Sequence, residues 1–166
     1  MLVLISGLPG SGKSYFGQKL AAAIGAIYLN SDKVRVQMRG SGKYSDEDKL
    51  LVYKQMALDA SEALDVGKDV VADATFSRQS FREQFERLSA TQGTPLHIIV
   101  VKADEDTIRK RLSSPREFSE ADFKVYEKLR DEFEEITVPH LELRSTDSNL
   151  DEMLRKAIKY TRHDSR

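Results

Sequence analysis

Cysteine is absent from this 166-residue sequence, so the chain can form neither a disulfide nor a thiolate metal site. An excess of either charge is also absent, because 26 Lys and Arg residues oppose 27 Asp and Glu residues and give a formal net charge of -1. Without a global positive field, the chain cannot hold long nucleic acid through counterion release over an extended surface. Any contact with a polynucleotide must therefore be local.

Long hydrophobic runs are missing as well. The apolar stretch near the N-terminus covers only residues 2–5, too few for a signal peptide or a membrane span. The composition is 40% hydrophobic and 32% charged, as in globular proteins, and repeats and low-complexity tracts are not found. We expect a cytoplasmic protein with no membrane partner and a single domain over residues 1–166.

Short apolar segments alternate with amphipathic segments along the chain. This pattern predicts an α/β fold, a three-layer sandwich in which helices cover both faces of a five-stranded parallel sheet. The expected strands are residues 2–5, 27–29, 70–73, 96–101 and 140–143. Helices are expected after residue 12, from Ser45, after a Ser77 cap, after Asp104, from Ser119 and over residues 150–158. Ligands of such folds bind beyond the carboxyl ends of the strands.

Residues 7–14 read Gly-Leu-Pro-Gly-Ser-Gly-Lys-Ser and fit the P-loop pattern G-x-x-x-x-G-K-[ST] between an expected strand and an expected helix. Glycines in this pattern let backbone N–H groups surround a phosphate, and the helix N-terminus adds a partial positive charge. The lysine reaches the β- and γ-phosphates, and the final serine offers its hydroxyl to Mg²⁺. The sequence therefore predicts that ATP or another NTP binds with Mg²⁺ to Gly10, Ser11, Gly12, Lys13, Ser14 and the adjoining Tyr15.

A second polar segment, Asn-Ser-Asp-Lys-Val-Arg at residues 30–35, follows the second expected strand. It places Asp32 and Arg35 one helical turn apart at the same edge as the P-loop. The carboxylate can take a proton, and the guanidinium can hold an anion. Alternatively, Ser31 or Asp32 only caps a short helix and Arg35 is a solvated charge; the neighbouring phosphate site favours the chemical role.

With these motifs, the sequence resembles the P-loop kinases related to phage polynucleotide 5'-kinase, the kinase modules of bacterial RNA-repair enzymes, zeta toxins and chloramphenicol phosphotransferase. The resemblance runs across nearly the whole chain. It rests on residues 7–14 and 30–35, on Asp-Ala-Thr at 73–75, and on Arg111-Leu112 followed by Arg116. It implies a P-loop NTPase fold like that of nucleoside-monophosphate kinases, with a small helical lid at about residues 109–118.

The resemblance also implies individual roles. Asp32 matches the general base for the acceptor hydroxyl, and Arg35 matches a residue that binds an acceptor phosphate. Arg111 and Arg116, with a weaker case for Arg109, match lid arginines that close over ATP, exclude water and stabilise the transferring phosphoryl group. Lys13, Asp32 and Arg116 are thus the predicted catalytic residues.

Other residues near this edge keep two interpretations. Asp73, at the end of the third strand, could hold Mg²⁺ through water or orient Arg35, or it could be a simple strand-end carboxylate. Arg82, one turn after Arg78, could meet an acceptor phosphate or pair with Glu86 on an exposed face.

Position 76 departs from the family pattern. RNA-repair kinases often continue Asp-Ala-Thr with Asn, whereas this chain has Phe76. This favours a small apolar acceptor or one that contacts an aromatic ring.

These features predict an ATP-dependent phosphotransferase that acts on a hydroxyl group. A polynucleotide 5'-OH end is the first expected acceptor, in a whole protein or in a module of a larger repair enzyme. The alternative is a small-molecule kinase for a nucleoside, antibiotic, sugar or nucleotide-sugar, which the near-neutral charge favours. A regulatory nucleotide-binding switch would need a water-positioning residue in place of Asp32 and would leave the lid arginines without a role.

Overall fold

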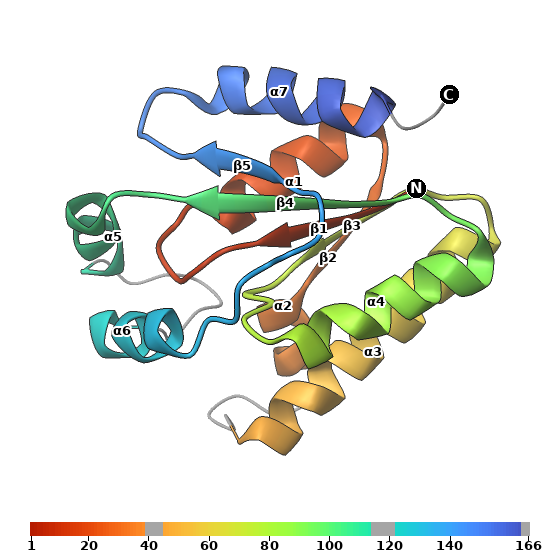
Figure 1. The fold of residues 1–166 in the computed structure, drawn as a ribbon, viewed down its shortest axis with the longest axis horizontal. Helices are drawn as coiled ribbons and strands as arrows, with labels where there is room; N and C mark the ends of the chain where they lie inside the picture. Colours follow the sequence, from red (N-terminus) through yellow and green to blue (C-terminus); the bar gives the residue numbers. More distant parts are fainter. Residues whose placement is uncertain (39–44, 114–121, 164–166) are drawn as a thin grey trace.

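The computed structural model describes residues 1–38, 45–113 and 122–163. Its centre is a five-stranded parallel sheet in the order β2-β3-β1-β4-β5 (Figure 1). The strands are β1 (Leu2–Ser6), β2 (Ile27–Asn30), β3 (Val70–Asp73), β4 (Leu96–Lys102) and β5 (Leu141–Arg144). The register pairs Asp73 with both Ile5 and Asn30, so the polar ends of β1, β2 and β3 meet at one edge.

Helices cover both faces of this sheet (Figure 1). On one face lie α1 (Lys13–Ile24) and α7 (Leu150–His163), and on the other lie α3 (Asp46–Asp65) and α4 (Gln79–Gln92). The short α2 (Ser31–Gln37) follows β2 directly, and α5 (Glu105–Leu112) and α6 (Phe123–Asp131) lie beyond the carboxyl end of β4. The predicted three-layer α/β fold is therefore confirmed.

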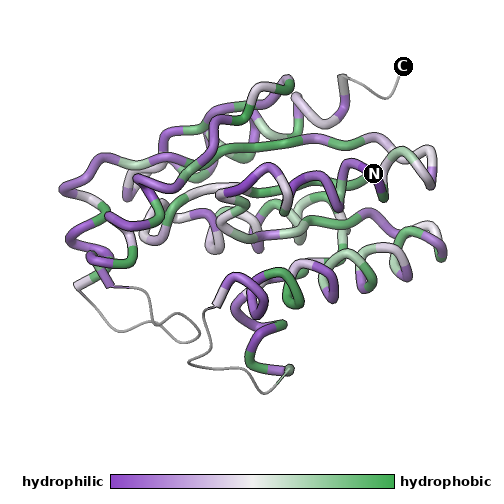
Figure 2. Tube along the Cα trace, turned by 60° about the horizontal axis from the view of Figure 1, so that its bottom comes forward, coloured by the Kyte–Doolittle hydropathy of each residue, from purple (hydrophilic) through white to green (hydrophobic). Residues whose placement is uncertain are grey.

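Strand side chains alternate between two hydrophobic cores because successive residues of a strand face opposite sides of the sheet. Val3 and Ile5 of β1 pack in the core beneath α1 and α7, whereas Leu2 and Leu4 pack in the core beneath α3 and α4. Figure 2 shows hydrophobic stretches along the strands, while the helices alternate between hydrophilic and hydrophobic residues. Full burial of a side chain such as Leu4 contributes about 1.5–3 kcal/mol, so both cores hold the strand ends in place.

Two helix starts differ from the sequence-based expectation. The predicted Ser77 cap is wrong: α4 begins at Gln79 after Arg78, because the Glu134 carboxylate rather than the Ser77 hydroxyl accepts the first helical N–H, that of Gln79, at 2.5 Å. The expected start of the later helix at Ser119 lies outside the described residues. The described helix α6 begins after Asp122, whose carboxylate accepts the Val125 N–H as an N-cap.

None of the helices in the described segments has the length and apolar character that a bilayer span requires.

Candidate active site

The P-loop turn between β1 and α1 has a backbone that requires glycine. Gly12 precedes α1 at φ 90°, and a Cβ on it would lie 2.8 Å from Ser145 Oγ. A Cβ on Gly7 would lie 2.5 Å from the Val101 carbonyl oxygen. The turn therefore packs directly against β4 and the end of β5, and Lys13 and Ser14 become the first residues of α1. Ser11 is buried, and its Oγ has no hydrogen-bond partner within the described segments.

A pocket of about 610 Å³, the larger pocket, opens beside this turn. Its volume lies within the range of ligand sites, about 300–1,000 Å³. The predicted Tyr15 stands at its rim, 60% exposed, with Lys19 Nζ 5.6 Å from its ring centroid. The lining residues come from the P-loop, α5, the loop after β5 and α7; they are Gly10, Gly12, Lys13, Ser14, Tyr15, Phe16, Lys110, Arg111, Ser145, Thr146, Asp147, Leu150 and Met153.

Arg111 joins two walls of the larger pocket. Its Nη1 donates to the Gly10 carbonyl at 3.3 Å and to Ser145 Oγ at 3.2 Å, and its Nη2 donates to Asp147 at 3.1 Å. The hydrogen bond from Arg111 lowers the pKa of Asp147. The structure thus places the predicted Arg111 at the P-loop.

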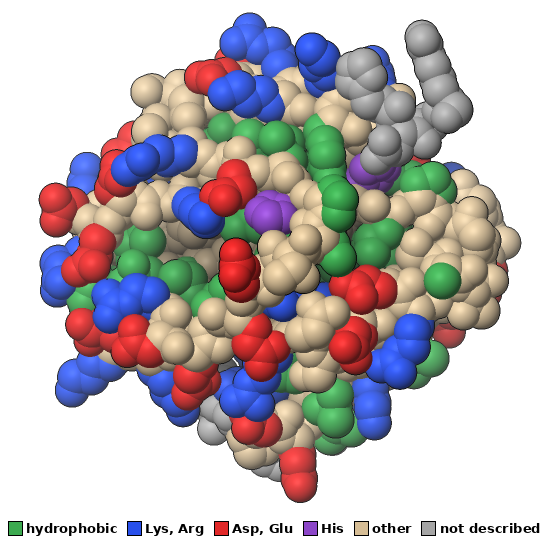
Figure 3. Space-filling model, viewed as in Figure 1, with side chains coloured by type: hydrophobic (Ala, Val, Ile, Leu, Met, Phe, Trp, Pro, Cys, Tyr) green, Lys and Arg blue, Asp and Glu red, His purple; other side chains and the backbone are tan. Residues whose placement is uncertain are grey.

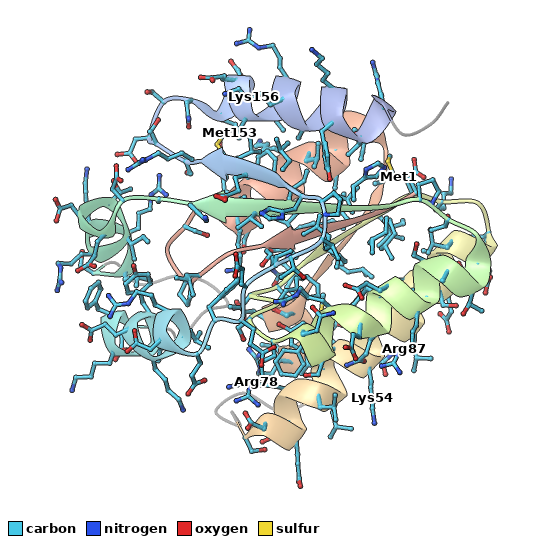
Figure 4. The ribbon with its side chains drawn as sticks, in the orientation of Figure 1. Met1, Lys54, Arg78, Arg87, Met153 and Lys156 are labelled. Carbon is cyan, nitrogen blue, oxygen red and sulfur yellow. The ribbon has the colours of Figure 1, made fainter. Side chains whose placement is uncertain are left out.

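The loop of residues 145–147 was missed from the sequence. It follows a strand of only four residues, and no motif marks it. Its residues reach the P-loop only because β5 lies beside β4 in the sheet. Figure 4 shows Met153, another missed residue of this pocket, between α7 and β5.

Asp73 is completely buried at the end of β3 and is held by two donors. Tyr28 Oη and Asn30 Nδ2 each donate to its Oδ2 at 2.6 Å. Burial, followed by the charge of Asp73, raises the pKa of the Tyr28 hydroxyl. Tyr28 Oη also lies 3.1 Å from the Ser14 carbonyl, so Asp73 lies close to the P-loop helix.

Asp73 Oδ1 is left buried without a hydrogen-bond partner among the described residues. An unpartnered buried carboxylate oxygen is costly unless a ligand satisfies it. An oxygen donor next to a P-loop serine has the chemistry that hydrated Mg²⁺ prefers. The residues present therefore fit the predicted Mg²⁺ site, with Ser14 as a ligand and Asp73 acting through water.

A second pocket of about 260 Å³, the smaller pocket, lies on the other side of Lys13. It is bounded by the P-loop, α2, α3, the turn after β3 and α6. Its lining residues are Pro9, Lys13, Ser31, Asp32, Arg35, Lys49, Tyr53, Thr75, Ser77, Phe81, Val125, Lys128 and Leu129. Lys13 lines both pockets, so a group held in one lies next to a group held in the other.

Asp32 and Arg35 both line the smaller pocket, as expected from their spacing. Arg35 Nη1 donates to Asp32 Oδ1 at 2.8 Å, and the two side chains are 16% and 27% exposed, respectively. The helix that carries them is capped by Asn30, whose side chain accepts the Lys33 N–H at 3.1 Å. Asn30 thus links the site of Asp32 to that of Asp73.

The aromatic wall of the smaller pocket is not made by Phe76. Phe76 is fully buried, makes an edge contact with Phe85 and does not line the pocket. Tyr53 and Phe81 provide this wall instead, with ring centroids 4.3 Å apart and planes tilted by 13°. Burial raises the pKa of the Tyr53 hydroxyl.

Arg82 also differs from the expectation. It is only 1% exposed, and its guanidinium donates to the carbonyls of Phe76, at 2.7 Å, and Glu135, at 3.1 Å. Burial lowers the pKa of Arg82, and the nearby Glu134 and Glu86 oppose that shift. Arg82 therefore neither lies on an exposed face nor reaches an acceptor phosphate. A cation on an amphipathic helix is normally solvated, and one of the two carbonyls that satisfy this one, that of Glu135, is 53 residues away in sequence.

The predicted lid is described only in part. Arg116 lies outside the described residues. Arg109 lies over the Phe123 ring, 3.7 Å from its centroid, and lines neither pocket. With the ion pair between Arg130 and Glu105, this contact joins α5 to α6.

Comparison with known proteins gives the family. Residues 2–136 match the family model described as AAA domain, which covers most of the chain. The uncharacterized protein Rv2004c of Mycobacterium tuberculosis is 28% identical over 123 residues, 67% of this chain. The match spans 25% of that protein, and the same holds for Mb2027c of Mycobacterium bovis. The chain thus spans about a quarter of the length of these curated relatives.

Solved structures give the fold. The APS kinase CysC of Mycobacterium tuberculosis, in complex with AMPPNP and APS, has a TM-score of 0.76 at 19% identity over 96% of both chains. A sugar kinase from Janibacter sp. has a TM-score of 0.73 at 15% identity, over 96% of this chain and 93% of that one. A gluconokinase from Sinorhizobium meliloti has a TM-score of 0.67 at 19% identity, over 95% of this chain and 89% of that one. The chain therefore belongs to the AAA domain family and has the fold of P-loop kinases.

Proposed function

We propose that this chain is an ATP-dependent kinase that phosphorylates a hydroxyl group of a small molecule. The observation that carries the proposal is the position of Lys13, which lines the larger pocket and the smaller pocket at once. A donor in one pocket and an acceptor in the other would meet at the side chain that binds the β- and γ-phosphates.

In this proposal the larger pocket holds ATP. Its phosphates lie on the N–H groups of residues 10–14, and Lys13 neutralises their charge. Ser14 and Asp73 hold Mg²⁺, which supplies further positive charge to the phosphate oxygens when it is bound. Arg111 keeps the P-loop against the loop of residues 145–147 beside the nucleotide.

Transfer then requires a base at the acceptor. The Asp32 carboxylate accepts the proton of the acceptor hydroxyl while the hydroxyl oxygen bonds to the γ-phosphorus. The bond between this phosphorus and the β–γ bridging oxygen breaks, and ADP leaves. Arg35 holds the Asp32 carboxylate in position through their ion pair.

The smaller pocket favours a small acceptor over a nucleic-acid end. Its volume of about 260 Å³ falls just below the usual range for drug-sized ligands. Positive and negative side chains are interspersed on the face drawn in Figure 3, so that face offers no continuous basic track for a polynucleotide. The solved kinases of the same fold named above include a sugar kinase and a gluconokinase.

The charges of the smaller pocket indicate that the acceptor carries an anionic group besides its hydroxyl. Lys49 and Lys128 face the pocket from α3 and α6. Their carboxylate partners, Asp46 and Glu132, are 3.7 and 3.9 Å away, distances at which exposed ion pairs are weak. An acceptor carboxylate or phosphate could therefore compete for both lysines, while its carbon skeleton contacts the Tyr53 and Phe81 rings.

Replacement of Asp32 by Asn tests the proposed chemistry. The variant keeps the shape of the side chain but cannot take the proton, so kcat should fall by roughly 10² to 10⁴ while the affinity for a nonhydrolysable ATP analogue stays near normal. Asp131→Asn, at an exposed carboxylate outside both pockets, is the matched control. Full transfer activity in folded Asp32→Asn would refute the role of Asp32 as the base.

A further inference from the structure

The turn after β3 has a strained backbone at the edge of the smaller pocket. Phe76 adopts φ 50°. Among the residues that the structure describes, no other non-glycine residue has a positive φ. This left-handed conformation is unfavourable for a bulky side chain and persists only where the surroundings enforce it. Thr75 and Ser77, on either side of it, both line the smaller pocket. The strained residue therefore lies between two residues that line the smaller pocket.

Buried hydrogen bonds hold Phe76 in this conformation from two sides. Its N–H donates to Tyr53 Oη at 2.9 Å, and its carbonyl accepts from Arg82 Nη1 at 2.7 Å. The preceding residue is fixed to β1, because the Thr75 carbonyl accepts from Ser6 Oγ at 2.9 Å. The turn is thus fixed to β1 on one side and depends on Arg82 on the other.

Arg82 also holds the opposite wall of the pocket. Its Nη2 donates to the Glu135 carbonyl, in the segment that follows α6. The adjacent Glu134 N–H donates to the Ser77 carbonyl at 2.8 Å. The helix α6 supplies Val125, Lys128 and Leu129 to the pocket. One buried guanidinium therefore bridges the turn and the segment that positions α6.

A partly exposed arginine, Arg78, reinforces the same junction. Figure 4 shows Arg78 where α4 begins, and its guanidinium pairs with Asp46 of α3 at 3.0 Å and with Glu132 at 3.9 Å. Arg78 lines neither pocket. The outer bonds are near solvent and weak, so Arg82 provides the buried part of the connection.

We propose that Arg82 is a positioning residue for the acceptor: it enforces the strained Phe76 turn and sets the distance between that turn and α6, and so the fit of the smaller pocket to its substrate. This inference rests on the proposed function. Arg82 touches no reacting atom and acts through Thr75, Ser77 and α6. Without it, the turn can relax and the two walls can separate, while none of the hydrogen-bond partners of Arg82 lines the larger pocket.

The test compares how Arg82 variants change the KM for the acceptor and the affinity for the nucleotide. In Arg82→Met, which keeps the apolar stem and removes the donors, KM for the acceptor should rise by roughly tenfold to a hundredfold, as for other small misplacements near the chemistry. The affinity for a nonhydrolysable ATP analogue should stay within about twofold. Arg82→Lys, which can still donate to one carbonyl, should fall between this variant and the wild type. Arg87→Met, at an exposed arginine of the same helix labelled in Figure 4, is the control and should change neither value.

A second readout does not depend on catalysis. Hydrogen exchange at the amides of Phe76 and Glu134 should become faster in both Arg82 variants, while residues 10–14 keep wild-type protection. If Arg82→Met does not fold, Arg82→Lys carries the same measurements. An unchanged acceptor KM in a folded variant, or equal losses for acceptor and ATP analogue, would overturn the positioning role. Absence of transfer by the wild type to every acceptor would refute the proposed function instead, and the exchange rates would still decide whether Arg82 holds the turn.

Discussion

The two pockets that meet at Lys13 are held together in different ways. In the larger pocket, Arg111 is 23% exposed and joins the P-loop to the loop after β5 through part-buried bonds to Gly10 and Ser145 and through an ion pair with Asp147, whose side chain is 68% exposed. In the smaller pocket, the walls are joined through Arg82, which is 1% exposed and bonded to two carbonyls. Ion pairs near solvent contribute little, whereas a buried carbonyl that loses its donor costs about 1–3 kcal/mol.

This difference indicates which pocket wall is held more firmly. Under the proposed function, a wall held in part by an exposed ion pair suits a site that exchanges nucleotides in every cycle. Under the same proposal, walls joined by a buried residue suit a site that must distinguish one small acceptor from similar molecules. Lys13 belongs to both, so its loss should damage the two sites together.

The largest effect is expected at the shared residue. Lys13→Ala removes the cation from the β- and γ-phosphates, so kcat should fall by at least as much as in Asp32→Asn, roughly 10² to 10⁴. Steady-state transfer measurements, with thermal unfolding to confirm the fold, would check this. A folded, ATP-binding Lys13→Ala protein with full activity would refute the proposed role of Lys13 between the two pockets.

A smaller effect, confined to the larger pocket, is expected at Arg111. Arg111→Ala removes a charge-assisted contact with the P-loop and the loop of residues 145–147, so KM for ATP should rise roughly tenfold. The acceptor KM should stay the same because Arg111 does not line the smaller pocket. Equal changes in both KM values would mean that the two pockets are not independent. Arg87→Ala, at an exposed arginine outside both pockets, is the control.

A change of a few fold at most is expected at Lys128. The residue is 68% exposed, and an exposed charge contributes at most about 1 kcal/mol, or roughly fivefold in affinity. Lys128→Met should therefore raise the KM for anionic acceptors by up to roughly fivefold and leave the KM for neutral analogues unchanged. The comparison needs matched acceptor pairs at two salt concentrations, since salt should reduce the difference. The same effect on neutral acceptors would remove the proposed role of its charge.

The smallest effect concerns stability rather than turnover. Burial raises the pKa of Tyr28 in the folded state above its usual 10.0, so the folded protein binds this proton more tightly than the unfolded chain. The stability from this group is complete below about pH 10 and is lost as pH rises further. Tyr28→Phe should show a shallower alkaline loss of unfolding free energy than the wild type in urea titrations. Identical slopes would show that Tyr28 titrates normally.

The parts of the site that follow a contiguous motif could be predicted from the sequence. The P-loop and the segment with Asp32 and Arg35 were placed correctly because strand ends in a parallel sheet meet at one edge. Their chemical roles stay predictions. The Asp73 position was also identified, but not its bonds to Tyr28 and Asn30, which require the pairing of β2 with β3.

The rest depends on contacts between distant segments. Arg82 has the pattern of a solvated helix residue, and its burial follows from Glu135, 53 residues away. Lys49 and Tyr53 lie one turn apart on α3, but the sequence does not indicate that this face meets Lys13. The left-handed turn at Phe76 contradicts local preference, and tertiary bonds override it.

The most direct test of the central claim is transfer of labelled γ-phosphate from ATP to a panel of small hydroxyl compounds, each as an anionic and a neutral analogue, beside 5'-OH DNA and RNA oligonucleotides. Asp32→Asn serves as the inactive control. The account predicts label on a small anionic acceptor, at a rate far above that of ATP hydrolysis, and little label on oligonucleotides. Label on oligonucleotides alone would make a polynucleotide end the acceptor. Release of inorganic phosphate with no labelled product would contradict the kinase assignment.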